Sequence, residues 1–549
     1  MSDPSEPDPQ STSEAVNAVA AAAAADDFGR ASTIADAALA KGYIHPALFN
    51  ARALWLQRQG RDSEALDEFQ RARALATRDV TLLNAIGLCM TRLGRLKEAI
   101  DVFDESLRTS PAHAPTHQRK GAALAMSGEN RQAGQSWQRA VQLQPGNAEA
   151  LAGLASIAAA DGNGEGARAC SERALRSDPR NATAHATLAL LDVERSEFVA
   201  AEQRLRPLLD RADVAGHGRA VALGLLGDAL DGQDRTSEAF EAQRAANAEL
   251  HALHAPRFGA GRSPCEVVEA LAGWLATAAP ETLSFAADSG EPPEQPARQQ
   301  VFLLGFHRSG TTLLEQVLRS NSDVTSLEER DALGDLAERY LTSADGFERM
   351  ASLAGPSLAV ARAEYWRNVR GFGVEPNGKV FVDKHPLNTI KLPLIARLFP
   401  KAKILFAMRD PRDVVLSCFR RHFEINAAMF QYLTLEGTAR FYDAVMRVGD
   451  LARTTSSLEI LEHRYETMIL DFEGQTKAVC AFIGVPWDAA MKNFAARARG
   501  QDIRSPSARQ VRRGLYAGSV GQWRRYRAEL EPVLPILQPW AERFGYPPD

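Results

Sequence analysis

The chain has 549 residues, 45% of them apolar, and a formal net charge of −5 at neutral pH. A single hydrophobic core rarely extends over this length, so a one-domain protein is excluded and two or more domains are expected. Nothing in this charge balance indicates nucleic-acid binding, so any anion site must come from locally clustered arginines and lysines. The five cysteines are scattered and odd in number. They predict structural thiols in a reducing compartment, and we expect a cytoplasmic protein, with export by a route that uses no cleavable signal as the alternative.

The first residues, 1–11 (MSDPSEPDPQS), are polar and rich in proline, and we expect them to form a disordered tail. An alanine run near 18–25 follows, but it is short, flanked by acidic residues and without a basic leading region. Neither a signal peptide nor a membrane span is therefore predicted.

Residues 12–255 carry an internal repeat. Four registers of small or turn-forming residues recur every 34 positions: Ala31 to Ala201, Gly60 to Gly162, Pro111 to Pro179, and Ala53 to Ala189. This period is typical of tetratricopeptide helix-turn-helix units. Glycine ends the first helix of each unit, and proline separates the units. We expect units from near 12, 46, 80, 114, 148 and 182, and a looser seventh near 216, stacked into an α-solenoid.

Residues 256–298 differ from the repeats. One helix-like stretch (CEVVEALAGWLATA) is followed by a polar, proline-containing segment, which predicts a capping helix and a linker. From 299 to 549, apolar strand-like runs alternate with amphipathic helical stretches. This alternation predicts an α/β domain with a parallel sheet.

A glycine loop, GFHRSGTT (305–312), follows the first apolar run of this domain, VFLL. Its glycine spacing is that of a phosphate-binding loop, but Thr311 stands where such a loop has lysine. Backbone N–H groups and the N-terminus of the following helix can hold an anion, with hydroxyls from Thr311 and Thr312 and a planar charge from Arg308. The alternatives are a capped strand-to-helix turn without a ligand, and an ATPase or kinase that the missing lysine disfavours.

A second strand-turn-helix segment is KAKILFAMRDPRDVVLSCFRRHF (401–423). Arg409 ends its strand, and Ser417 lies two turns into its helix. Both can reach one phosphate at the carboxyl end of the sheet. Taken alone, the segment is better explained by a salt bridge from Arg409 to Asp410 or Asp413, and only the glycine loop upstream favours the phosphate site. Arg412 is expected to be structural or peripheral.

The stretch HRSGTTLLEQVLRSNSDVTSLEE resembles the phosphosulfate loop of sulfotransferases that use 3′-phosphoadenylyl sulfate (PAPS), above all the tyrosylprotein-sulfotransferase branch. With the repeats, the whole chain resembles bacterial proteins that join tetratricopeptide repeats to a sulfotransferase domain. The resemblance implies an α-solenoid followed by an α/β, P-loop-like sulfotransferase domain. It implies that PAPS is the co-substrate, that no metal is required, and that Arg308, Ser309, Gly310, Thr311 and Thr312 hold the phosphosulfate.

Further roles are also implied by the resemblance. Glu329, the second Glu of LEE, would be the general base, which requires a raised pKa or a tight hydrogen bond to the acceptor. Lys384 and Arg308 would face the bridging oxygen of the scissile bond. His385 is the rival base, and it departs from the branch, which tends to have Asp there. Glu328 is expected to be structural.

The remaining candidates complete the cofactor site. The resemblance gives Arg409 and Ser417 the 3′-phosphate of PAPS and places Ser507, in SPSARQVRRGLYAGSVGQW (505–523), beside the reacting group. Tyr465 would lie near the cofactor. The adjacent Arg512 and Arg513 would close over its phosphates, and the sequence does not choose between them.

The predicted function is sulfuryl transfer from PAPS to a hydroxyl of an unidentified protein, peptide or glycan. The repeats would recruit the acceptor or a partner, or mediate self-association. No nucleic-acid partner is expected. The alternative functions are a catalytically silent repeat scaffold and, less favoured, a nucleotide kinase.

Overall fold

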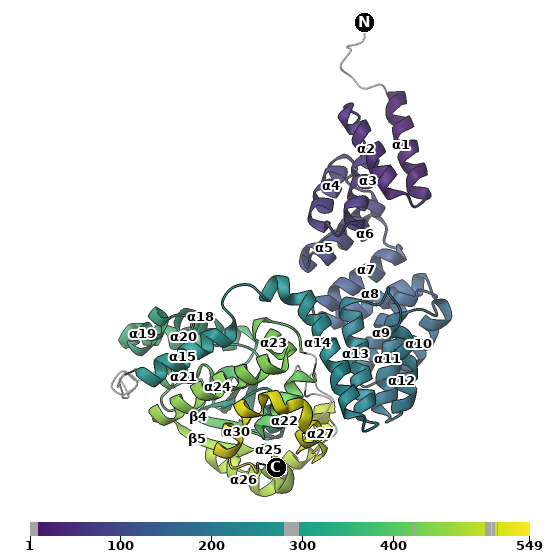
Figure 1. The fold of residues 1–549 in the computed structure, drawn as a ribbon. Coiled ribbons are helices and arrows are strands. Elements are labelled where there is room, and N and C mark those ends of the chain that lie inside the picture. The colour runs from purple at the N-terminus through teal and green to yellow at the C-terminus, as the bar shows by residue number, and fades with distance from the viewer. Residues whose placement is uncertain are drawn as a thin grey trace. The chain divides into compact units, whose positions relative to one another are not determined.

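The computed structural model describes residues 9–278, 296–421, 423–499, 507, 511–512, 514–515 and 517–548. The chain folds as two compact units, Met1–Arg211 and Ala212–Asp549 (Figure 1). Helix α1 (Pro9–Ala24) includes positions 9–11, which the sequence placed in a disordered tail, whereas 1–8 lie outside the described residues.

The first unit consists of helices joined by tight turns, and consecutive helices pair along the chain (Figure 1). After α1 they are α2 Phe28–Ala40, α3 Pro46–Arg58, α4 Asp62–Leu75, α5 Val80–Arg92, α6 Leu96–Thr109, α7 Ala114–Met126, α8 Asn130–Leu143, α9 Ala148–Ala160, α10 Gly164–Ser177, α11 Ala182–Glu194 and α12 Phe198–Leu209. The helix pairs recur every 34 residues. This arrangement confirms the predicted helical repeat.

Two of the repeated registers have a clear physical cause. The turn glycines adopt the left-handed conformation, with φ between 72° and 81°, at Gly60, Gly94, Gly128 and Gly162. A Cβ on Gly87 would lie only 2.5 Å from the Phe103 ring, and a Cβ on Gly121 equally close to the Trp137 ring. The first register ends helices where a side chain would be strained, and the second lets paired helices touch.

The last repeat-like hairpin, α13 (Gly216–Asp231) and α14 (Thr236–Phe258), belongs to the second unit. Asn247 Nδ2 donates to the Phe419 carbonyl at 2.8 Å. The rings of Phe240 and Phe419 stack at 5.1 Å. Asp231 Oδ2 lies 2.7 Å from Arg420 Nη2. Although the sequence assigns this hairpin to the solenoid, its inner face is part of the core of the second unit.

The other elements of the second unit are α15 Pro264–Thr277, β1 Gln299–Leu304, α17 Thr311–Leu318, β2 Val324–Glu328, α18 Gly334–Tyr340, α19 Ala344–Ala351, α20 Gly355–Gly371, β3 Val380–Lys384, α21 Leu392–Leu398, β4 Lys403–Met408, α22 Pro411–Phe419, α23 Ala427–Phe430, α24 Leu435–Thr455, β5 Glu459–Arg464, α25 Tyr465–Leu470, α26 Phe472–Ile483, α27 Phe494–Arg499, α29 Arg527–Leu530 and α30 Leu534–Arg543. Short 3-10 helices link several of them.

The strands form one parallel sheet with the order β2-β3-β1-β4-β5. Along β1, Val301 and Leu303 pack with α17 and α26 on one face. Phe302 and Leu304 pack with α15, α20 and α24 on the other. Helices therefore cover both faces, as predicted for an α/β domain with a parallel sheet. The strand order reverses around β1, so ligands are expected at the carboxyl ends of β1, β3 and β4.

Candidate active site

The loop after β1 approaches its neighbours so closely that two positions require glycine. A Cβ on Gly305 (φ 155°) would lie 2.4 Å from the Ala407 carbonyl oxygen of β4. A Cβ on Gly310 (φ 97°) would lie 2.8 Å from the ring of Tyr465. Arg308, between them, has a φ of 68°, which is uncommon for a residue with a side chain. The loop is therefore held tightly against β4 and the first residue of α25 (Tyr465–Leu470), in a conformation that sets the direction of Arg308.

The Arg308 guanidinium is buried and connects three segments. Its Nε donates to Ser417 Oγ of α22 at 3.0 Å, and its Nη1 donates to Ser507 Oγ. Burial, followed by the charges of Arg421 and Arg409, lowers the pKa of Arg308 to about 9. Several guanidinium groups gathered in a buried place favour an anion between them.

Arg409 lies directly after β4 and points to the same place. Its Nη1 donates to the Arg308 carbonyl at 3.1 Å, and its guanidinium lies 5.1 Å from the centre of the Tyr465 ring. The nearest Asp413 carboxylate oxygen is 3.8 Å away, so the alternative salt bridge is a long one. Among the described residues, Nε of this buried arginine has no hydrogen-bond partner. An unsatisfied, buried cationic donor suits an anionic ligand.

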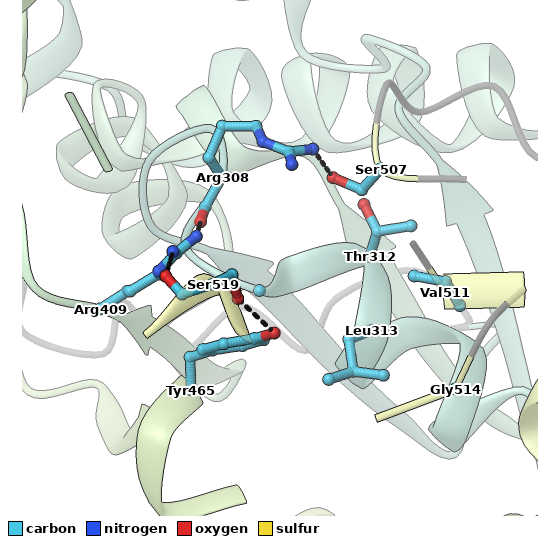
Figure 2. Close-up of a pocket in the computed structure, with 10 residues that line it drawn as sticks. Arg308, Thr312, Leu313, Arg409, Tyr465, Ser507, Val511, Gly514 and Ser519 are labelled. Carbon is cyan, nitrogen blue, oxygen red and sulfur yellow. Dashed lines mark hydrogen bonds between the residues drawn. The ribbon is translucent and has the colours of Figure 1, made fainter. Parts of the chain in front are cut away.

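A pocket of about 420 Å³ opens between these segments. Figure 2 shows Arg308 reaching Ser507 on one side, while Arg409 and Tyr465 meet Ser519 on the other. The described lining residues are Arg308, Gly310, Thr312, Leu313, Arg409, Tyr465, Ser507, Val511, Gly514 and Ser519. Arg409 and Ser417 also line an adjoining pocket of about 550 Å³. The expected binding of one phosphate by these two residues is therefore sterically possible.

Other predicted cofactor residues lie differently. Ser309 and Thr311 are not among the described lining residues, and Ser309 Oγ donates to the Phe306 carbonyl at 2.6 Å. Arg512 is half-buried, and its Nε donates to the Ala498 carbonyl at 3.4 Å. Arg513 lies outside the described residues. Ser519, which the sequence had not singled out, lines both pockets.

A second cluster lies at the ends of β2 and β3, where the parallel pairing sets Glu328 beside Lys384. Lys384 Nζ is 2.7 Å from Glu329 Oε1 and 3.1 Å from Glu315 Oε2. Glu315, on α17, also accepts from Ser326 Oγ at 2.8 Å. The sequence reading missed Glu315, which lies one helical turn after Thr311 and therefore on the same face of α17.

The charge state of this cluster follows from its contacts. Burial alone would lower the pKa of Lys384, but the Glu315 and Glu329 carboxylates raise it above its ordinary value. Burial acts to raise the pKa of Glu329, but Lys384 outweighs it and the pKa is lowered. Of the two conditions set for a base, a raised pKa is therefore not met, and Glu329 stays ionised at neutral pH. Glu328 instead lies 3.5 Å from Arg319.

Two histidines complete the site. Burial lowers the pKa of His385 to about 4, and among the described residues its Nδ1 has no hydrogen-bond partner. His307, which the sequence reading did not assign a role, contacts Tyr432 OH through Nδ1 at 2.8 Å. Burial lowers its pKa to about 3, and the charges of Glu329, His385, Lys384 and Arg308 all act on it. Charges from both clusters therefore act on one neutral imidazole.

This geometry agrees with a comparison of the chain with known families. Residues 300–489 match the model of the sulfotransferase family. This region is a sulfotransferase-family domain. The match covers β1 to β5 and includes Arg308, Glu329, Lys384, Arg409 and Ser417.

Individual relatives point the same way. The domain is similar to an uncharacterized protein of Aquifex aeolicus, 27% identical over 44% of this chain and 33% of that protein, so the chain spans only a third of it. It is also similar to protein-tyrosine sulfotransferase 1 of Danio rerio, 23% identical over 45% of this chain and 72% of that protein. Protein-tyrosine sulfotransferase A of Caenorhabditis elegans is 23% identical over 45% of this chain and 67% of that protein.

Among solved structures, a tetratricopeptide repeat protein from Parabacteroides merdae is 19% identical, with a TM-score of 0.37 over 44% of this chain and 94% of its own.

Within the described residues, no helix has the length and apolarity that a membrane span requires. The same residues contain no group of three or more His, Cys, Asp or Glu side chains placed to hold a metal ion.

Proposed function

We propose that the protein transfers the sulfuryl group of PAPS to the hydroxyl of an acceptor, with Glu329 as general base. The observation that supports this most is the convergence on Arg308. Its guanidinium is held by Ser417 and Ser507, its backbone carbonyl accepts from Arg409, and its charge acts on His307 together with those of Glu329 and Lys384. Anion-binding groups and a carboxylate base thus border one site.

The residues present fit the co-substrate. PAPS carries a phosphosulfate and a separate 3′-phosphate, and the site offers two adjoining pockets with Arg409 bordering both. We assign the phosphosulfate to Arg308, Gly310 and Thr312, and the 3′-phosphate to Arg409 and Ser417. Ser309 and Thr311 would contribute backbone N–H groups at the N-terminus of α17. Tyr465, Arg512 and Arg513 remain candidates for the nucleotide side.

The chemistry that PAPS supplies is a sulfuryl group bound to a good leaving group, the nucleotide phosphate. Glu329 takes the proton from the acceptor hydroxyl, whose oxygen forms the new S–O bond. The electron pair of the broken S–O bond passes to the nucleotide phosphate. Arg308 and Lys384 balance the charge on that oxygen, and Ser507 helps to orient Arg308.

We propose the acceptor only as a chemical class and the role of the repeats only in general terms. The relatives' names make peptide tyrosine the first acceptor to test, with glycans second. The first unit has a groove of about 890 Å³ lined by acidic and basic residues, including Asp36, Arg52 and Glu68, and by the aromatic Trp55. We propose that the repeats bind a polypeptide there, either the acceptor or a partner, in the cytoplasm.

Calorimetric titration tests the nucleotide assignment. We expect 3′-phosphoadenosine 5′-phosphate to bind the full-length protein in EDTA, and ATP with Mg²⁺ to bind much more weakly. The reverse order would favour a nucleotide kinase. Absence of binding by both nucleotides would favour a repeat scaffold without catalysis.

A further inference from the structure

Lys384 contacts two carboxylates of very different accessibility. The ammonium is fully buried, with 0% of the side chain exposed. Glu315 is also 0% exposed, whereas Glu329 is 17% exposed. A substrate can therefore reach only Glu329, although both carboxylates lie within 3.1 Å of Lys384 Nζ.

Three different elements fix Glu315 in place. It lies on α17, the helix that begins with Thr311 and Thr312, and its Oε1 accepts from Ser326 Oγ of β2 at 2.8 Å. Its Oε2 faces Lys384 at the end of β3. A buried carboxylate is costly unless it is paired and hydrogen-bonded, and Lys384 and Ser326 provide these two contacts.

We infer that Glu315 is a positioning residue, the permanent counter-ion of Lys384, which leaves Glu329 able to take a proton from the acceptor. The catalytic part of this inference rests on the proposed function. If the base were the sole partner of a buried ammonium ion, its protonation would leave that positive charge without a counter-ion. With Glu315 in place, the buried Lys384 stays an ammonium ion, and its charge still acts on the site after Glu329 is protonated.

The inference can be tested without turnover, because Glu329→Gln imitates the protonated base. The full-length protein would be labelled with ¹³C at lysine Cε, and Lys384 would be assigned by its loss in Lys384→Arg. In Glu329→Gln we expect Lys384 to remain charged at pH 8. In Glu329→Gln combined with Glu315→Gln, the ratio of ammonium to amine should fall by about tenfold or more.

A matched control separates contact from net charge. Glu329→Gln combined with Glu328→Gln removes an equal charge from a residue that neighbours Lys384 in the sheet but whose carboxylate contacts Arg319. That variant should keep Lys384 charged. If the Glu315 double variant does not fold, Glu329→Gln with Ser326→Ala serves instead, and it should lower the ratio in the same direction by a smaller factor.

Two results would overturn the inference: loss of the Lys384 charge in Glu329→Gln alone, or an unchanged charge when Glu315 is also replaced. Titration with 3′-phosphoadenosine 5′-phosphate distinguishes failure of the Glu315 inference from failure of the proposed function. A protein that does not bind the nucleotide but keeps the Lys384 charge in Glu329→Gln contradicts the proposed function alone.

Discussion

Arg308 Nε donates to Ser417 Oγ at 3.0 Å, which joins the glycine loop after β1 to the helix after β4, 109 residues further along the chain. The bond links the two segments that separately predicted anion binding. Arg409 strengthens the link by donating to the Arg308 carbonyl. The two proposed anion sites therefore lie side by side at the carboxyl ends of neighbouring strands.

Arg409 should contribute strongly to nucleotide affinity. Replacing it with alanine removes a buried charge that has an unused donor, and charge-assisted hydrogen bonds contribute about 1.5–3 kcal/mol each. We expect the apparent KM for PAPS and the dissociation constant of 3′-phosphoadenosine 5′-phosphate to rise by at least about tenfold. Arg440→Ala, at a 61% exposed arginine paired with Glu269, is the control. Unchanged nucleotide binding in Arg409→Ala would contradict the assignment.

The lowered pKa of Glu329 predicts the acid limb of the activity profile. The base must be ionised, and Lys384 keeps its pKa below the ordinary 4.5. Activity at saturating PAPS should therefore persist as the pH falls through the ordinary carboxyl range and be lost only below it. A limb centred near 6.5, the ordinary value for histidine, would instead implicate an imidazole such as His385.

His307 should make stability depend on pH. Its pKa falls from 6.5 in the unfolded chain to about 3 in the folded protein, so its contribution is complete above 6.5 and is lost as the pH decreases. Between pH 7 and pH 5, linkage gives a loss of about 2 kcal/mol from this group. We expect the free energy of unfolding, measured with denaturant, to fall less between pH 7 and pH 5 in His307→Phe than in the wild type. The difference between the two losses should be about 2 kcal/mol. Equal losses would show that His307 is not neutral and buried.

Asp231 should hold the last repeat-like hairpin to the domain. Its carboxylate accepts from Arg420 at 2.7 Å, Arg525 at 2.8 Å and Tyr526 at 2.7 Å, and its side chain is 18% exposed. Replacing Asp231 with asparagine should reduce the free energy of unfolding by about 2 kcal/mol. The control is Asp234→Asn, because Asp234 is 90% exposed and shares only the Arg525 contact, so its cost should stay below about 0.5 kcal/mol. Equal effects would rule out the Asp231 network as the attachment.

The sequence predicted what depends on local patterns. The 34-residue registers predicted the helix pairs, because a turn glycine or a contact glycine is needed at each repeat. The strand-loop-helix segments located Arg308 and Arg409. The position of α13 and α14 was not readable in this way, because their helical pattern is the same whether they pack on another repeat or on α22.

Long-range electrostatics also escaped sequence reasoning. Glu315 reads as an ordinary residue of an amphipathic helix, and only the fold shows its carboxylate 3.1 Å from Lys384. A raised pKa, one of the two conditions that the sequence set for Glu329 as a base, did not allow for that lysine. His307 looked like part of a loop, yet the charges of both clusters act on it. Such groups meet through β2, β3 and α17, whose register no local pattern encodes.

The most direct test of the account is transfer of radiolabelled sulfate from PAPS to fractionated lysate proteins and a tyrosine peptide. Wild type, Glu329→Gln and His385→Gln would be compared after calorimetry has shown that each binds 3′-phosphoadenosine 5′-phosphate. We predict label transfer by wild type and by His385→Gln, and a loss of at least about a hundredfold in Glu329→Gln. Label transfer by Glu329→Gln at the wild-type rate, or by none of the proteins, would contradict it.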